Sequence, residues 1–457
     1  MVETLESKNP ATGETIGQVA ITPPQAIPQV VANARAARGA WAGRSLEERG
    51  EVLALAAAEL AERADELGAA LSREMGKPLA KGIGEVRGSA KSTAGKVAAA
   101  IAALQPVEHE DARSQTTLHY DPLGVCGVIS PWNYPLSMCH WMVVPALLAG
   151  NAVILKPSEQ TPLIAQAYAE VLQTHLPPGV LSVVHGRDEV GKALVAAEGV
   201  DMIVFTGSRA AGKHIMASAA PTLKRLVLEL GGKDPLLVLD DADLERAARF
   251  AVNNSLENSG QMCVSTERVF VHESLAEAFE ARVAELAREV RCGPYDEEGV
   301  TVGPMIDAAQ REHVLSQLES AVAAGARVLA GGGEHPPGYV VPTVLADVRD
   351  DMEIAREETF GPVVCLTRFS DLEQAIASAN AGRYGLGAVV FGGDEERAHA
   401  VARRLEAGMI GVNKSLFAAG DLPWVGAKES GYGYHGSPDG YRQFAQARVI
   451  SRRKAKS

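Results

Sequence analysis

Short apolar segments alternate repeatedly with amphipathic segments of helical length in two parts of this sequence. Between residues 152 and 220, "AVILK" precedes "TPLIAQAYAEVLQTH", "LSVVHG" precedes "DEVGKALVAA", and "MIVFTGS" precedes "AAGKHIMASAA". Short apolar runs that alternate with helices predict a parallel sheet wrapped by helices. A second series with the same rhythm follows "PLLVLDDAD" and includes "VVCLTRF", a helix from Asp371, "LGAVVFG", a helix from Asp394 and "MIGVN". The sequence therefore predicts two α/β domains.

Two further segments lie outside these series. Ser45-Leu-Glu-Glu48 is a capping box, which predicts a long Ala/Leu-rich helix that ends at Gly76. The segment 105–124 is polar, and its part "QTTLHYDPLG" alternates like an exposed hairpin strand. The final "RQFAQARVISRR" alternates in the same way. We expect the two alternating segments to pair in a small strand arm.

Composition and charge exclude several classes of partner. The 457 residues, with 46% hydrophobic and 22% charged, are enough for a soluble protein with two or three cores. The net charge of −13 argues against nucleic acid and against membrane surfaces, because both need clustered Lys and Arg. A small molecule is the expected partner.

Cysteine usage and the N-terminus predict a reducing, cytoplasmic location. The five cysteines are scattered and contain no CxxC pair, so neither a disulfide framework nor a metal site is expected. "MVETLESKNP" has no apolar core of the kind that a secretory signal requires. The segment 137–155 is uncharged, but it contains Pro145 and the turn pair Gly150-Asn151. These residues favour a helix to about Leu148 followed by a buried strand, and they argue against a membrane span.

A glycine loop follows one of the predicted strands. In "FTGSRAAGKH", Gly207, Gly212 and Lys213 fit the Walker pattern, but His214 stands where a nucleoside-triphosphate site needs Ser or Thr for Mg²⁺. The dinucleotide fingerprint G-x-G-x-x-G is absent as well. A glycine between a strand and a helix still suits a phosphate at the helix N-terminus. A plain strand-to-helix turn is the alternative.

Four other positions carry chemistry only in combination. Lys156-Pro157-Ser158-Glu159 closes a strand. There the Lys could donate to ribose hydroxyls and the Glu could accept from them. The alternative is that these residues form an ordinary charged strand end. Glu229 lies in an apolar strand, where an acid is usually paired or functional. Cys263 in "ENSGQMCVST" is either a nucleophile or an inert filler. Asn133 in "SPWNYPL" is either an oxyanion donor or a turn former.

Taken together and in this order, these stretches resemble the NAD(P)-dependent aldehyde dehydrogenases. The motifs that carry the resemblance are "NPATGE", "PWNYP", "LKPSEQTP", "FTGS", "LELGGK", "GQMC", "EETFGPV" and "SGYG", and they cover nearly the whole chain. The resemblance implies that the Gly207 loop faces the pyrophosphate of a dinucleotide. It also implies the aldehyde dehydrogenase fold, with two doubly wound Rossmann-like α/β domains and a β-strand oligomerisation arm.

The resemblance implies domain boundaries and an assembly. We expect a dinucleotide-binding domain over 1–104 and 124–231, a catalytic domain over 232–430, and the arm over 105–123 and 440–457. The expected assembly is a homodimer or a homotetramer.

The resemblance also implies the catalytic roles. Cys263 corresponds to the family nucleophile, which adds to the aldehyde carbonyl to give a thiohemiacetal and then a thioester. The Asn133 side chain and the Cys263 backbone N–H would hold the oxyanion. Glu229 corresponds to the base that activates water, and its presence favours a free carboxylic acid as the product.

The cofactor and substrate residues follow from the same correspondence. The expected cofactor-binding residues are Trp132, Lys156, Ser158, Glu159, Gly207, Ser208, Glu358 and Phe360. A carboxylate at Glu159 would repel a 2′-phosphate, so we expect NAD, with NADP possible because Lys156 could offset that repulsion. The expected tunnel residues are Tyr134, Met138, Trp141, Met262 and Trp424.

This wall of aromatic and Met residues favours apolar aliphatic or aromatic aldehydes. A succinate-semialdehyde or other semialdehyde dehydrogenase is the alternative, although residues 133–145 contain no arginine for a substrate carboxylate. "LPWVGAKESGYGYHG" departs from the family pattern, since Trp424 and Val425 replace Phe and Gly. A catalytically silent relative, kept for binding or structure, is the non-enzyme alternative.

Overall fold

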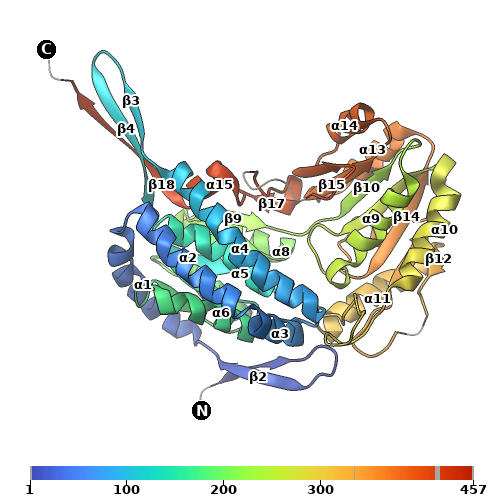
Figure 1. Cartoon of the computed structure of the whole chain (residues 1–457), viewed down its shortest axis with the longest axis horizontal. Coiled ribbons are helices and arrows are strands. Elements are labelled where there is room, and N and C mark those ends of the chain that lie inside the picture. The colour runs from blue at the N-terminus through green and yellow to red at the C-terminus, as the bar shows by residue number, and fades with distance from the viewer. Residues whose placement is uncertain (1–2, 334, 417–421, 455–457) are drawn as a thin grey trace.

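The computed structural model describes residues 3–333, 335–416 and 422–454, which form two α/β domains and a projecting arm (Figure 1). One domain, coloured blue to green, contains the N-terminal half, and the other, coloured yellow to red, contains most of the C-terminal half. The predicted fold class is confirmed.

The first domain is built on a sheet of six described strands. Their order is β17 (Gly431–Tyr432), β9 (Arg225–Glu229), β8 (Met202–Thr206), β5 (Val125–Ile129), β6 (Ala152–Lys156) and β7 (Leu181–Val183). All pairs are parallel except β17 with β9. The chain runs outward from β5 to β7 and then returns to the other side of β5. The loops after β5 and β8 therefore meet at the switch point, where open α/β sheets bind ligands.

Helices cover this sheet and bury apolar strand residues on both faces. They are η1 (Pro24–Ala26), α1 (Ile27–Ala42), α2 (Leu46–Glu62), α3 (Ala64–Met75), α4 (Leu79–Leu104), α5 (Pro135–Leu148), α6 (Pro162–His175), α7 (Asp188–Ala196), α8 (Arg209–Ala219) and η2 (Ala220–Thr222). An N-terminal hairpin of β1 (Thr4–Lys8) and β2 (Thr15–Ala20) lies beneath α3 in Figure 1.

The prediction of one helix from Ser45 to Gly76 is wrong in one respect, because this segment forms two helices, α2 and α3. The capping box is present, with the Ser45 hydroxyl accepting from the Glu48 N–H and the Glu48 carboxylate from the Ser45 N–H. The break lies at Arg63 (φ −93°, ψ 12°), whose guanidinium pairs with Glu66 at 2.8 Å. Gly76 ends α3 at φ 91°, a left-handed conformation that favours glycine.

The second domain contains a sheet of seven described strands. Their order is β12 (Arg327–Ala330), β13 (Thr343–Ala346), β14 (Val363–Phe369), β11 (Thr266–His272), β10 (Asp234–Val238), β15 (Gly387–Phe391) and β16 (Met409–Val412). Only β12 with β13 is antiparallel. The accompanying helices are α9 (Leu244–Leu256), η3 (Glu257–Gly260), α10 (Glu273–Glu289), α11 (Ala308–Ala323), α12 (Glu353–Arg356), α13 (Leu372–Asn380), α14 (Glu395–Ala402) and η4 (Lys428–Ser430).

The arm is a three-stranded antiparallel sheet that projects from the first domain, with the C-terminus at its tip (Figure 1). It consists of β3 (Val107–Glu110), β4 (Ser114–Pro122) and β18 (Ala445–Arg453), and α15 (Ser437–Gln443) precedes β18. The pairing of β18 with β4 runs from Ala445↔Pro122 to Arg453↔Ser114. Most of β18 is exposed, including Val449 and Ile450.

The apolar segment considered for a membrane span is α5, a helix of 14 residues that is largely buried in the first core. In the part of the chain that the structure describes, no helix combines the length and apolar character needed to cross a bilayer.

Candidate active site

Three loops converge where the two domains meet. Asn133 follows β5, Glu229 is the last residue of β9, and Cys263 precedes β11. The Asn133 Nδ2 atom donates to the Gln261 carbonyl at 3.1 Å, which joins the first loop to the loop that carries Cys263. The Trp424 indole donates to Glu229 Oε1 at 3.4 Å. The structure thus brings together the three residues predicted to be catalytic.

The loop before Cys263 has an uncommon backbone. Asn258 (φ 53°) and Ser259 (φ 61°) are consecutive left-handed residues that are not glycine, and each such residue costs about 1–3 kcal/mol. Hydrogen bonds offset this cost: Asn258 Nδ2 donates to the Asn133 and Gln261 carbonyls, and Ser259 Oγ donates to the Gly303 carbonyl. Backbone strain held in this way is typical of functional loops.

Burial controls the electrostatics of Cys263 and Glu229. Removal from water raises the pKa of the Cys263 thiol well above its ordinary value, and the nearby Glu229 carboxylate raises it further. Burial raises the pKa of Glu229 to about 7, although hydrogen bonding with Cys263, Trp424 and Thr206 partly offsets the shift. The pair therefore consists of a protonated thiol beside a carboxyl that can accept a proton near neutral pH.

A buried ion pair holds the Asn133 loop. Lys77 Nζ lies 2.6 Å from Glu85 Oε2, with both side chains at most 3% exposed, and also donates to the Asn133 carbonyl at 2.9 Å. Glu85 Oε1 accepts from the backbone N–H groups of Leu136 and Ser137 at the start of α5. Sequence reasoning missed this pair, whose only local signal is a lysine between Gly76 and Pro78.

A second buried ion pair holds the loop with Glu358 and Phe360. Lys233 Nζ lies 2.5 Å from Glu267 Oε2, and the Glu267 carboxylate accepts from the backbone N–H groups of Thr359 and Phe360. The Phe360 ring meets Trp132 edge-on, with ring centroids 5.4 Å apart. Glu358 Oε1 accepts from the Gly232 N–H at 2.9 Å.

The remaining expected cofactor residues lie at the carboxyl edge of the first sheet. Lys156 Nζ and Glu159 Oε2 are 3.4 Å apart, so the cation and the acid face each other. Ser158 Oγ accepts from the Gln160 N–H. Ser208 caps α8, and its hydroxyl accepts from the Ala211 N–H. A Cβ at Gly207 would lie 2.5 Å from the Phe205 ring, so only glycine keeps this turn compact. The α8 N-terminus and these side chains fit the phosphate and ribose of a dinucleotide.

Most of the expected tunnel residues surround Cys263. Tyr134, Cys263 and Trp424 pack against a buried cluster that contains Met262, and the Tyr134 hydroxyl lies 3.7 Å from Met262 Sδ. Trp141 meets Trp424 edge-on at 5.7 Å, and both line a cavity of about 590 Å³. Met138 instead packs against the core of the first domain.

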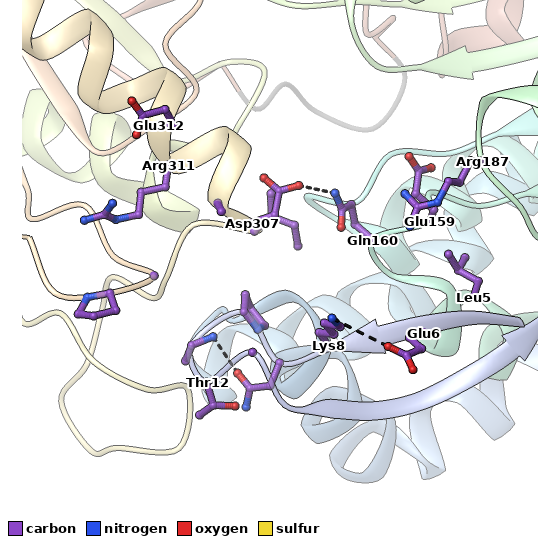
Figure 2. Close-up of a pocket in the computed structure, with 18 of the residues that line it drawn as sticks. Leu5, Glu6, Lys8, Thr12, Glu159, Gln160, Arg187, Asp307, Arg311 and Glu312 are labelled. Atoms are coloured by element: carbon purple, nitrogen blue, oxygen red, sulfur yellow. Dashed lines mark hydrogen bonds and ion pairs between the residues drawn. The ribbon is translucent and has the colours of Figure 1, made fainter.

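A separate cavity of about 1040 Å³ has Glu159 among its lining residues (Figure 2). Its walls come from the N-terminal hairpin, from the segment with Glu159 and Arg187, and from α11 of the second domain. Gln160 bridges the domains here by donating to Asp307 Oδ2 at 2.5 Å. Neither Cys263 nor Glu229 lines this cavity, so we place the chemistry in the cluster around Cys263.

Two Rossmann-like sheets, a capped helix at the switch point and a thiol beside a titratable acid define a class: nucleotide-dependent enzymes with a cysteine nucleophile. A family model described as "Aldehyde dehydrogenase family" matches residues 1–450. The chain belongs to the aldehyde dehydrogenase family.

Relatives are similar over nearly their whole length. A betaine aldehyde dehydrogenase from Sinorhizobium fredii (strain NBRC 101917 / NGR234) is 39% identical over 98% of this chain and 93% of its own. The structure of a succinate-semialdehyde dehydrogenase from Burkholderia pseudomallei has 36% identity and a TM-score of 0.95, covering 98% and 94%. An NADP-dependent enzyme from E. coli has 32% identity and a TM-score of 0.96, covering 99% and 95%.

The buried pair at Lys77 generates a prediction. The variant K77M should lower the free energy of unfolding by about 3–5 kcal/mol, because it leaves the Glu85 carboxylate buried without its cation. Urea unfolding followed by circular dichroism measures the loss. The control is K81M, which removes an exposed lysine paired with Glu257 at 2.9 Å and should cost about 1 kcal/mol or less. Equal losses in the two variants would contradict the assigned role of Lys77.

Proposed function

We propose that this enzyme oxidises an aldehyde to the free carboxylic acid with NAD, through a thiohemiacetal and a thioester on Cys263. The observation that carries the proposal is the Cys263 thiol beside a buried Glu229 whose pKa is about 7. A carboxyl with this pKa is half ionised at neutral pH, which suits a group that must both accept and release a proton.

The first step is addition of sulfur to the carbonyl. Glu229 accepts the thiol proton, and the thiolate bonds to the aldehyde carbon. The carbonyl oxygen becomes an oxyanion, which the Asn133 side-chain amide and the Cys263 backbone N–H stabilise; one such donor is typically worth a factor of about 10² to 10³. The hydrogen bond from Asn133 to Gln261 keeps that amide beside the loop of Cys263.

Bound NAD supplies the acceptor for the hydride that leaves the thiohemiacetal carbon. Glu358 and Phe360 would hold its nicotinamide half, next to Trp132. Lys156, Ser158 and Glu159 would hold the adenosine ribose, and Gly207 and Ser208 the pyrophosphate. On the chain, the product of this oxidation is an acyl thioester at Cys263. Glu229 releases the thiol proton to solvent and then takes a proton from water as the water attacks the thioester. It returns this second proton to the departing thiolate when the acid is released.

Glu159 supports NAD over NADP. A 2′-phosphate beside this carboxylate would face like charge at close range, which costs several kcal/mol. Lys156 lies 3.4 Å from Glu159 and is the group that could offset part of this repulsion. The NADP-dependent relative from E. coli keeps the other cofactor open as an alternative.

The assembly and location are part of the proposal. The exposed β18, with Val449 and Ile450 on its surface, supports a homodimer or a homotetramer formed through the arm. The five cysteines are all unpaired, which supports a reducing compartment such as the cytoplasm. For the substrate, the Met and aromatic side chains around Cys263 support an apolar body. A semialdehyde, as named for the Burkholderia relative, is the alternative.

The first test removes the nucleophile. C263A should abolish NADH formation from aldehydes while NAD still binds, because the cofactor residues are unchanged. Absorbance at the NADH band and calorimetric titration with NAD measure the two properties. C292A removes a half-buried cysteine elsewhere in the second domain and should retain activity. Persistent turnover in C263A would overturn the mechanism. No NADH formation by wild type with any aldehyde would instead favour a catalytically silent relative.

The second test uses pH. With the pKa of Glu229 at about 7, kcat/KM should fall about tenfold per pH unit below 7, because the protonated acid cannot accept a proton. E229Q should lower the rate by a factor of about 10² to 10⁴ and remove this limb of the profile. W424F should keep the limb but move its midpoint upward, because the indole N–H stabilises the ionised acid. An unchanged profile in E229Q would reject the assigned base.

The third test concerns the cofactor. E159S should raise the ratio of kcat/KM for NADP over that for NAD by about tenfold or more, because the repelling carboxylate is gone. Steady-state rates with each cofactor at fixed aldehyde give the ratio. E159Q is the control that preserves size and removes only the charge, and it should shift the ratio in the same direction. A ratio unchanged in both variants would refute the role of Glu159.

A further inference from the structure

The cavity of about 590 Å³ opens between α4 and the segment after β16, and its lining includes two of the expected tunnel residues, Trp141 and Trp424. Its apolar wall contains Trp141, Met409, Leu416 and Trp424. Its other wall is one face of α4, from which Lys91, Ser92, Gly95 and Lys96 line the cavity. Two lysines therefore border a space whose remaining lining residues are mostly apolar.

This cavity shares three lining residues with the cluster around Cys263. Met409, Leu416 and Trp424 line the cavity and also belong to the cluster around Cys263. Trp424 contacts Glu229 with its indole N–H and Trp141 with its ring. An aldehyde whose carbonyl carbon lies at Cys263 would therefore extend its other end along Trp424 and Trp141 toward α4.

Lys96 is a cation that forms no ion pair with any of the described residues around this cavity. Its ammonium donates to Ser92 Oγ at 2.6 Å and lies 5.2 Å from the centre of the Trp141 ring. Burial lowers the pKa of Lys96 to about 8, and no carboxylate of the described residues offsets the shift. A half-buried, mostly charged lysine gains free energy when an anion enters its surroundings.

We propose that Lys96, with Lys91 at the rim, binds an anionic group at the far end of the substrate, so that the preferred aldehydes carry a carboxylate opposite the aldehyde group. This inference rests on the proposed function and names its substrate class. The cation comes from α4, not from residues 133–145, where the sequence contains no arginine.

The same geometry disfavours a cationic substrate. Paired indoles can bind a quaternary ammonium, but Lys96 already lies over the Trp141 ring, and a second cation there would face like charge in a partly buried space. The enzyme should therefore discriminate against betaine aldehyde, the compound in the name of its 39% identical relative.

The distance from Cys263 to Lys96 also constrains the part of the substrate between its aldehyde and its carboxylate. Two indoles, in contact at 5.7 Å, lie between Glu229 and Lys96, so the segment between the aldehyde and the carboxylate must span both. An aromatic ring or an extended chain meets this requirement better than the short chain of succinate semialdehyde. Apolar walls with one cation at the end are the usual composition of such a pocket.

The experiment compares an acid with its neutral ester. Wild type is assayed for NADH formation with 4-carboxybenzaldehyde and with its methyl ester, and with adipate semialdehyde and its methyl ester. We expect kcat/KM to be about tenfold or more higher for each acid, mainly through KM. K96M should lower this acid-to-ester ratio about tenfold, which is the usual worth of one charged hydrogen bond, and K96R should restore most of it.

The control removes the same charge from the same helix outside the cavity. Arg87 lies on α4 and pairs with Asp65 at 2.8 Å, so R87M should leave the acid-to-ester ratio unchanged. K91M, at the exposed rim, should lower the ratio by less than K96M. A wild-type preference for the esters or for betaine aldehyde, or an equal ratio in K96M and R87M, would overturn the inference.

A binding readout separates this inference from the proposed function. Terephthalate should quench the fluorescence of Trp141 and Trp424 in C263A, and more weakly in C263A/K96M. If no aldehyde yields NADH but terephthalate binds through Lys96, the proposed function fails and the anion site stands. If aldehydes are oxidised but neither the acid-to-ester ratio nor terephthalate binding depends on Lys96, the anion site fails alone.

Discussion

Two buried lysine–glutamate pairs hold the loops on which the rest of the site depends. Lys77 with Glu85 fixes the start of α5 and the Asn133 carbonyl, and Lys233 with Glu267 fixes the loop that carries Phe360. Each carboxylate also accepts from two backbone N–H groups. A buried ion pair with these extra hydrogen bonds offsets its desolvation and leaves few alternative positions for the loops.

Between these loops, burial sets the chemistry. The thiol of Cys263 is kept protonated and the Glu229 carboxyl titrates near neutrality, because both have lost water. Trp424 touches both the acid and Trp141. One side chain thus connects Glu229 to the wall of the cavity of about 590 Å³.

That position is where this chain departs from its family's usual pattern, in which Phe and Gly stand in place of Trp424 and Val425. A phenyl ring cannot donate to a carboxylate, whereas an indole can. The same indole lines the cavity that Lys96 borders from α4. Trp424 therefore touches both the Glu229 carboxyl and the wall of this cavity, and a Phe at this position could not donate to Glu229.

Much of the architecture could be predicted from the sequence. The alternation of apolar and amphipathic segments predicted both α/β domains, because strand and helix periods are local properties. The strands at 114–122 and 445–453 pair as their alternation indicated. The long helix from Ser45 is expected as one piece but breaks at Arg63. No Pro or Gly marks that position, so no local signal predicts the break.

The two domains and the glycine turn after β8 can be predicted locally, since each depends on neighbours in the chain. Which side chains meet depends on the packing of elements that are far apart in the sequence. Lys77, Glu85 and Lys96 carry no distinctive local pattern, and their surroundings come from elements far away in sequence, such as α5 and the segment around Trp424. Desolvation and charge pairing are properties of the packed molecule, so the pKa of Glu229 and the cation at the end of the cavity follow only from the fold.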